Sequence, residues 1–294
     1  MRGRGAIPDP SAPLTPSGNL RRRQVVSKFA EYAATAAAAL AVAVLAIVIY
    51  TVASRGADAL SFDFLIKGAP DGIGPMLVGT GVIVGVATLM AAPVGILIAL
   101  YVTEYAGRRS ARVIQMTLDV MNGLPSIIIA LFIFGLLVYK KEQSGFAGSI
   151  ALAIIMVPLI ARGTQEILLL VPKAQREAAD ALGVARWRTV LTIILPSAIG
   201  GIATATVLAV ARAAGETAPL LFASSNFNPS EYALNPFDPL PNVPIRIFQL
   251  SEDPNPEAVT EAWGLALVLV TLILIASLSA RFLLARSKRK MGGT

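Results

Sequence analysis

The chain of 294 residues contains no histidine and no cysteine. Their absence excludes a His- or Cys-ligated metal site, a thiol nucleophile, a Ser-His-Asp triad and a disulfide framework. The sequence also lacks the Gly-x-x-x-x-Gly-Lys-Ser/Thr pattern of a P-loop, so we expect no such nucleotide site in the chain. Together these absences argue against an enzyme.

Charge is scarce as well. Charged residues make up only 15% of the chain, whereas a soluble domain has about 25%. Hydrophobic residues make up 55%, against about 45–50% in a soluble domain. This balance predicts an all-α integral membrane protein. Because a spanning helix needs about 20 apolar residues, the uncharged stretches predict six transmembrane helices, at about 30–53, 76–101, 116–139, 146–163, 196–221 and 262–284. We expect kinks at Pro93, Pro125 and Pro158, where neighbouring helices can satisfy the freed carbonyl groups.

The distribution of Lys and Arg predicts the orientation in the membrane. Nineteen of the 25 lie in the two termini and in the loops between spans two and three and spans four and five. Five lie in the remaining loops, and Arg212 lies inside span five. Since short cytoplasmic loops carry the excess of positive charge, both termini are predicted to be cytoplasmic. The net charge of +7 is then a topology signal and does not indicate nucleic-acid binding.

The composition also divides the chain into segments. Residues 1–28 are rich in Pro, Gly and Arg and predict a disordered basic cytoplasmic tail. Residues 29–285 form the predicted transmembrane domain, with a core at about 72–284 and the first span peripheral. Residues 286–294 form a second basic cytoplasmic tail. Residues 223–261, with seven prolines and six acidic residues, predict an irregular external loop with short helices.

The predicted cytoplasmic loop at 164–195 is too long for a simple connection. Pro172 suits the first turn of a helix, and Gly183 stands where that helix would end in a left-handed cap. A second, amphipathic helix with Trp187 and Val190 on one face leads to Pro196. The pattern therefore predicts a helix, a glycine turn and a second helix at the membrane surface.

The sequence Glu177-Ala178-Ala179, followed by Gly183, Ile193 and Leu195-Pro196, resembles the EAA motif of bacterial binding-protein-dependent ABC importer permeases. The resemblance implies the type I ABC importer permease fold. It also implies that the 164–195 loop couples the chain to a separate ATPase through Glu177, Ala178, Ala179 and Gly183. ATP and Mg would be bound by that ATPase, and no cofactor by this chain. The alternative is an interfacial helix-turn-helix that has no partner.

A second segment, Ala211-Arg-Ala-Ala-Gly-Glu-Thr-Ala-Pro-Leu-Leu-Phe222, resembles the end of span five in permease subunits of phosphate importers. This implies ATP-driven passage of inorganic phosphate into the cell across the bacterial cytoplasmic membrane. The implied partners are a second permease subunit (PstC), two copies of the ATPase PstB and the extracytoplasmic phosphate-binding protein PstS. A permease for sulfate or molybdate is the nearest alternative. An ion-gradient-driven secondary transporter is another, and it predicts inverted repeats, which the sequence does not display.

Two charged residues within span five need an explanation that is independent of any family. A charge inside the bilayer costs about 2.5–3.5 kcal/mol on insertion scales, so such residues usually face a bundle interior or a water-filled cavity. Arg212 and Glu216 share a helix face, either as a simple anchoring ion pair or along the path of an oxyanion. Arg162 is a second path candidate, or it reaches the headgroups, and Glu166 could pair with it. Thr217 adds a hydroxyl donor to the candidate path.

Overall fold

The computed structural model describes residues 20–69, 71–226 and 231–291. Within these ranges the secondary structure is helical, without strands. The chain consists of two units, residues 1–51 and residues 52–294. The elements in chain order are α1 (Leu20–Gly56), η1 (Ala57–Ala59), α2 (Phe62–Ile66), α3 (Gly74–Leu100), η2 (Tyr101–Tyr105), α4 (Arg108–Gly123), α5 (Ser126–Ile133), η3 (Phe134–Val138), α6 (Gly145–Leu169), α7 (Lys173–Ala181), α8 (Arg186–Thr189), η4 (Val190–Ile194), α9 (Leu195–Ala214), α10 (Ala218–Ala223), α11 (Val243–Ser251) and α12 (Pro256–Met291).

The first predicted span lies within α1, which is longer than expected. The prediction of a disordered tail over 1–28 is wrong for residues 20–28, which are helical. The physical reason is local: from Leu20 to Arg55 the sequence contains neither Pro nor Gly, so nothing breaks the helix. Residues 1–19 lie outside the described residues.

Among the described residues, five helices are long and apolar enough to cross a bilayer, and the bent pair of α4 and α5 brings the number to as many as six. The third predicted span is therefore not a kinked helix. It is broken at Leu124 and Pro125, and its two halves meet at 93°. The fifth predicted span is also interrupted, because α9 ends at Ala214 and α10 begins at Ala218. Pro93 and Pro158, by contrast, stand inside unbroken helices.

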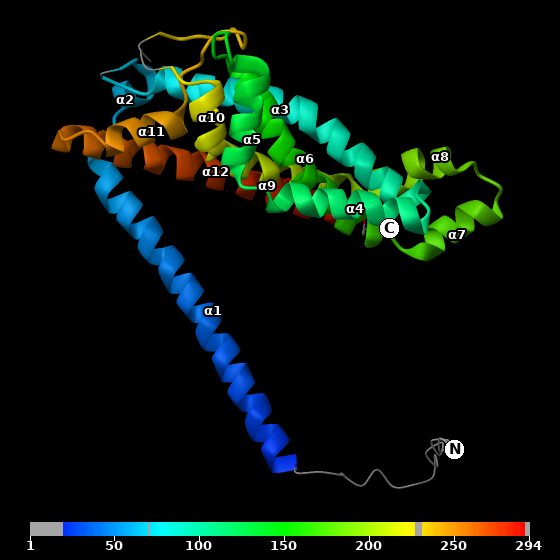
Figure 1. Ribbon diagram of the computed structural model, residues 1–294. Coiled ribbons are helices and arrows are strands. Elements are labelled where there is room, and N and C mark those ends of the chain that lie inside the picture. Colours follow the sequence, from blue (N-terminus) through cyan, green and yellow to red (C-terminus); the bar gives the residue numbers. More distant parts are fainter. Residues whose placement is uncertain (1–19, 70, 227–230, 292–294) are drawn as a thin grey trace, which may run out of the picture. The chain divides into compact units, whose positions relative to one another are not determined.

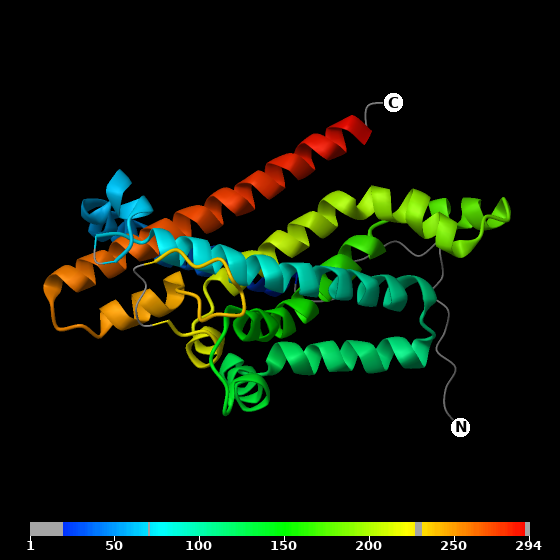
Figure 2. The same cartoon turned by 90° about the horizontal axis from the view of Figure 1, so that it is seen from above.

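The core of the second unit is built from α3, α6, α9 and α12. α3 packs along α6, α6 along α9 and α9 along α12 (Figures 1 and 2). Ile83, Leu152 and Met156 are fully buried at the centre of this layer. Glycine permits the close approach of α6 and α9, because a Cβ atom on Gly163 would lie 2.6 Å from the Cβ of Ala205.

The predicted external loop at 223–261 is partly helical. α11 begins after Asn242, whose side chain accepts a hydrogen bond from the backbone N–H of Ile245 at 3.2 Å. α11 packs against the start of α12, where Arg246 and Glu261 form an ion pair of 3.1 Å. α12 continues to Met291, through most of the predicted tail at 286–294. Residues 227–230 and 292–294 lie outside the described residues.

We predict that Met156→Ala destabilises the folded chain by about 2–5 kcal/mol, because it leaves a cavity in a fully buried position. Leu89→Ala is the control, since Leu89 is on the same layer of helices but 77% exposed, and its truncation leaves no internal cavity. Unfolding in mixed detergent micelles measures both variants. Equal destabilisation would contradict the placement of Met156 in the core.

Candidate functional site

The 164–195 loop has the predicted local structure. α7 begins directly after Pro172 and ends before Gly183, which has a φ of 67°. The turn is a Schellman motif: the N–H of Val184 donates to the carbonyl of Ala179 and the N–H of Gly183 to that of Asp180, each at 3.0 Å. α8 then continues through the π-helical η4 into α9. The prediction of a helix, a glycine turn and a second helix is confirmed.

The four EAA residues do not lie on one face. Glu177, Ala178 and Gly183 are exposed, whereas Ala179 is buried against the rest of the bundle. Leu182, which the sequence analysis did not single out, is 81% exposed beside the glycine turn. Of these five residues, Glu177, Ala178, Leu182 and Gly183 are therefore accessible on the loop, and Ala179 is not.

Arg212 and Glu216 are close together at the interruption between α9 and α10. The Arg212 Nε lies 3.6 Å from the Glu216 Oε1, and the two side chains are 60% and 18% exposed. Such a distance is longer than a hydrogen bond. The two residues are therefore electrostatic neighbours, as their spacing predicts, but Glu216 does not saturate the guanidinium.

Both residues line a cavity of about 160 Å³ at the break between α4 and α5. Asn122 at the end of α4 and Ser126 at the start of α5 contribute the other polar side chains of its wall. The remaining wall residues are apolar: Met121, Leu124, Pro125, Ile129, Ile155 and Leu159. The two interrupted spans thus meet at one polar pocket.

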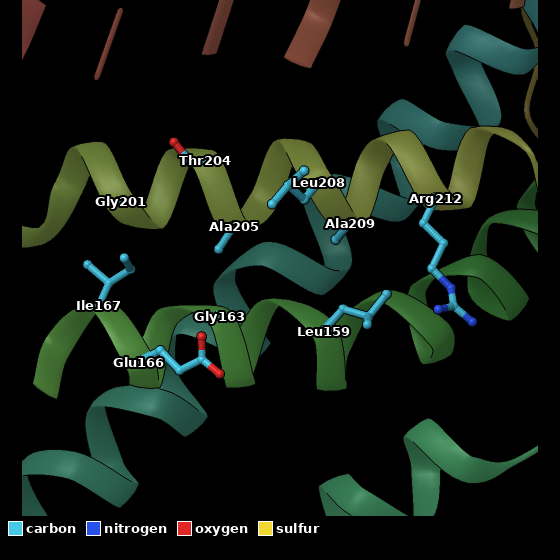
Figure 3. Close-up of a pocket in the computed structure, with 10 residues that line it drawn as sticks. All are labelled: Leu159, Gly163, Glu166, Ile167, Gly201, Thr204, Ala205, Leu208, Ala209 and Arg212. Carbon is cyan, nitrogen blue, oxygen red and sulfur yellow. The ribbon is translucent and has the colours of Figure 1, made fainter. Parts of the chain in front are cut away.

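Arg212 also closes one end of a groove of about 390 Å³ between α6 and α9. Figure 3 shows Arg212 at one end of the groove and Ile167 and Gly201 at the other, with the Glu166 carboxylate near Gly163. Thr204 lines the groove but bonds the backbone of its own helix, donating to the carbonyl of Gly200 at 3.1 Å. The lining is therefore mostly apolar, and Arg212 and Glu166 are its charged residues.

The other two path candidates lie elsewhere. Arg162 pairs with Asp119 of α4 and donates to the carbonyl of Gln115 at 3.0 Å, so its partner is not Glu166. These contacts tie α6 to α4, and Arg162 is not one of the residues that line the groove with Glu166. Thr217 is half-buried immediately before α10 and lines neither of the two cavities.

Comparisons with known proteins agree with this architecture. Residues 91–292 match the family described as binding-protein-dependent transport system inner membrane component. The phosphate transport system permease protein PstA of Yersinia pestis is 35% identical, over 82% of this chain and 84% of its own. The phosphate transport system permease protein PstA 1 of Mycobacterium tuberculosis is 37% identical, over 74% of this chain and 72% of its own. A chain of a bacterial ABC transporter involved in alginate import has the same fold, with a TM-score of 0.59 at 15% identity, over 90% of this chain and 99% of that one.

The fold is thus that of an ABC transporter permease, and the chain belongs to the binding-protein-dependent transport system inner membrane component family. Within that family its relatives are PstA permeases. It is accordingly a multi-pass protein of the bacterial inner membrane.

We predict that Gly183→Val speeds amide exchange at Gly183 and Val184 by about 5–30-fold, because a side chain in a left-handed conformation costs about 1–2 kcal/mol. Gly183→Asn is the matched control, since Asn tolerates that conformation. Hydrogen exchange with mass spectrometry reads out the turn directly. Equal protection in the two variants would show that the turn does not depend on the glycine.

Proposed function

We propose that this chain is the PstA-type permease subunit of an ABC importer that moves inorganic phosphate into the cell. The observation that carries the proposal is the 35–37% identity to PstA proteins over most of the chain. The phosphate specificity comes from those relatives. The pocket geometry supports it, because Arg212 presents a permanent cation to both cavities.

The proposed orientation has six spans and both termini in the cytoplasm. The start of α4 lies at the same end of the bundle as α7 and α8, and α2, α10 and α11 lie at the opposite end (Figures 1 and 2). Arg108, Arg109 and Arg112 in α4 and Arg176, Arg186 and Arg188 in the loop thus share one end. This clustering supports a cytoplasmic position for that end.

The proposed partners follow from the two ends. At the cytoplasmic end, Glu177, Ala178, Leu182 and Gly183 would dock into one of two PstB ATPase subunits. At the other end, the 223–261 segment with α11 would form part of the surface that receives the phosphate-binding protein PstS. PstC would complete the permease as the second membrane subunit.

The chemistry of the path rests on Arg212. Its planar guanidinium donates to the oxygens of an oxyanion in pairs, and the structure shows, over the described residues, no hydrogen bond that occupies it. Glu216 at 3.6 Å weakens the attraction for an anion. A transport site must bind loosely enough to release its ion, so we propose that this carboxylate prevents trapping.

We predict that Arg212→Ala lowers phosphate uptake by about 10–100-fold, since it removes charge-assisted hydrogen bonds to the anion. Radiolabelled uptake by cells that carry the full transporter measures the loss. Arg109→Ala, an exposed Arg outside the pocket, should transport normally. Co-purification of Arg212→Ala with PstC must persist, and near-normal uptake by this variant would refute the path role. Excess sulfate or molybdate, added to the wild type, decides between phosphate and the other oxyanions.

We predict that Glu177→Lys lowers the amount of ATPase that co-purifies with the permease. Glu177 is exposed on α7, so the substitution leaves the packing of the bundle intact and changes only the charge at the docking surface. Glu142→Lys, on the loop at the opposite end of α6, is the charge-matched control. Equal ATPase recovery with both variants would contradict docking through α7.

A further inference from the structure

Glu104 is the one buried charged side chain among the residues whose burial the structure describes, with 4% exposed. It lies in η2, the π-helical turn that continues α3. An unpaired carboxylate in such a position is strongly unfavourable. Its partner is Arg176 of α7, whose Nη2 lies 2.9 Å and whose Nε lies 3.2 Å from the Glu104 Oε1.

The Arg176 guanidinium also reaches the end of a third element. Its Nη1 donates to the carbonyl of Val171 at 2.7 Å and its Nη2 to the carbonyl of Leu168 at 2.9 Å. Leu168 lies in the last turn of α6, where its carbonyl also accepts from the N–H of Val171 at 3.3 Å, and Val171 lies two residues beyond the helix. One side chain therefore joins α7, the end of α6 and the end of α3. Only arginine has enough donors in a rigid fork to make all of these contacts.

A second contact attaches the other helix of the loop to the same turn. The Arg186 guanidinium, at the start of α8, lies over the Tyr105 ring at 5.7 Å from its centre. Beneath both contacts, Leu100, Leu168, Val190 and Ile194 form an apolar cluster. η2 is thus the point at which both helices of the 164–195 loop are held.

Arg176 and Glu177 are neighbours in sequence with opposite surroundings. Arg176 is half-buried and held by the bundle, whereas Glu177 is exposed on the proposed docking surface. Arg176 is thus a direct polar link from α7, which carries Glu177, to η2 and to the end of α6. α3 and α6 in turn form the buried core beside α9, which carries Arg212.

We propose that Glu104 and Arg176 are positioning residues that transmit motion of the coupling loop to α3 and α6, so that ATP hydrolysis drives transport. This inference rests on the proposed function, because it needs an ATPase that docks on the loop. Docking of the ATPase and transmission of its motion are separate tasks in this arrangement. The Glu104–Arg176 pair is required for transmission and not for docking.

The test uses the complete transporter in liposomes, with the variants Arg176→Gln, Glu104→Gln and the double variant. We expect each to co-purify with its ATPase in wild-type amounts. The stimulation of ATP turnover by phosphate-loaded binding protein, relative to basal turnover, should fall about fivefold or more, the usual range for coupling between sites. The double variant should lose no more than either single variant, because the two residues act as one unit.

Arg109→Gln is the control, because it makes the same change of side chain at an exposed position of α4 that lines neither cavity. It should leave the stimulation ratio unchanged. An unchanged ratio in Arg176→Gln, additive losses in the double variant, or loss of ATPase co-purification in both single variants would each overturn the inference. A wild-type complex that binds no ATPase or imports no phosphate would instead overturn the proposed function.

Discussion

In a lipid bilayer a peptide group has no water to bond with, so irregular backbone persists only where it is buried in protein or lines a water-filled cavity. This constraint explains where the bundle departs from straight helices. The break at Leu124 and Pro125 and the interruption at Gly215 occur in different spans, yet both border the cavity lined by Arg212 and Glu216. The interrupted backbone and the two charged side chains thus border the same cavity. Water in such a cavity can solvate both the free peptide groups and the charges.

Local patterns in the sequence predicted local structure well. Pro172, the helix-forming run after it and Gly183 specify the first helix and its turn with information from about a dozen residues, and the structure has both. The apolar stretches located the spanning segments for the same reason. The pairing of Arg212 with Glu216 was also accessible, since residues four apart on a helix face are neighbours.

Predictions that depended on packing fared worse. A proline alone does not predict the 93° bend after α4, because Pro93 and Pro158 stand inside unbroken helices. Arg162 was expected to have Glu166 as its neighbour, but Asp119, 43 residues away, is its partner. Glu104 and Arg176 are 72 residues apart, and nothing in either local sequence indicates the other. The local sequence also does not indicate that Ala179 is buried and Ala178 exposed, because this difference depends on how α7 packs against the rest of the bundle.

Three Arg–Glu pairs among the described residues of the second unit differ in a way that fits their positions. Arg176 with Glu104 and Arg246 with Glu261 contact at 2.9 and 3.1 Å, and they join α7 to η2 and α11 to α12. Breaking such a partly buried pair leaves a charge without compensation, so these contacts hold the two ends of the bundle in place. Arg212 is different, because it is 60% exposed and stands 3.6 Å from its partner. The loose contact of Arg212 suits the proposed path role, because its donors remain available to an anion, whereas the donors of Arg176 are occupied by Glu104, Val171 and Leu168.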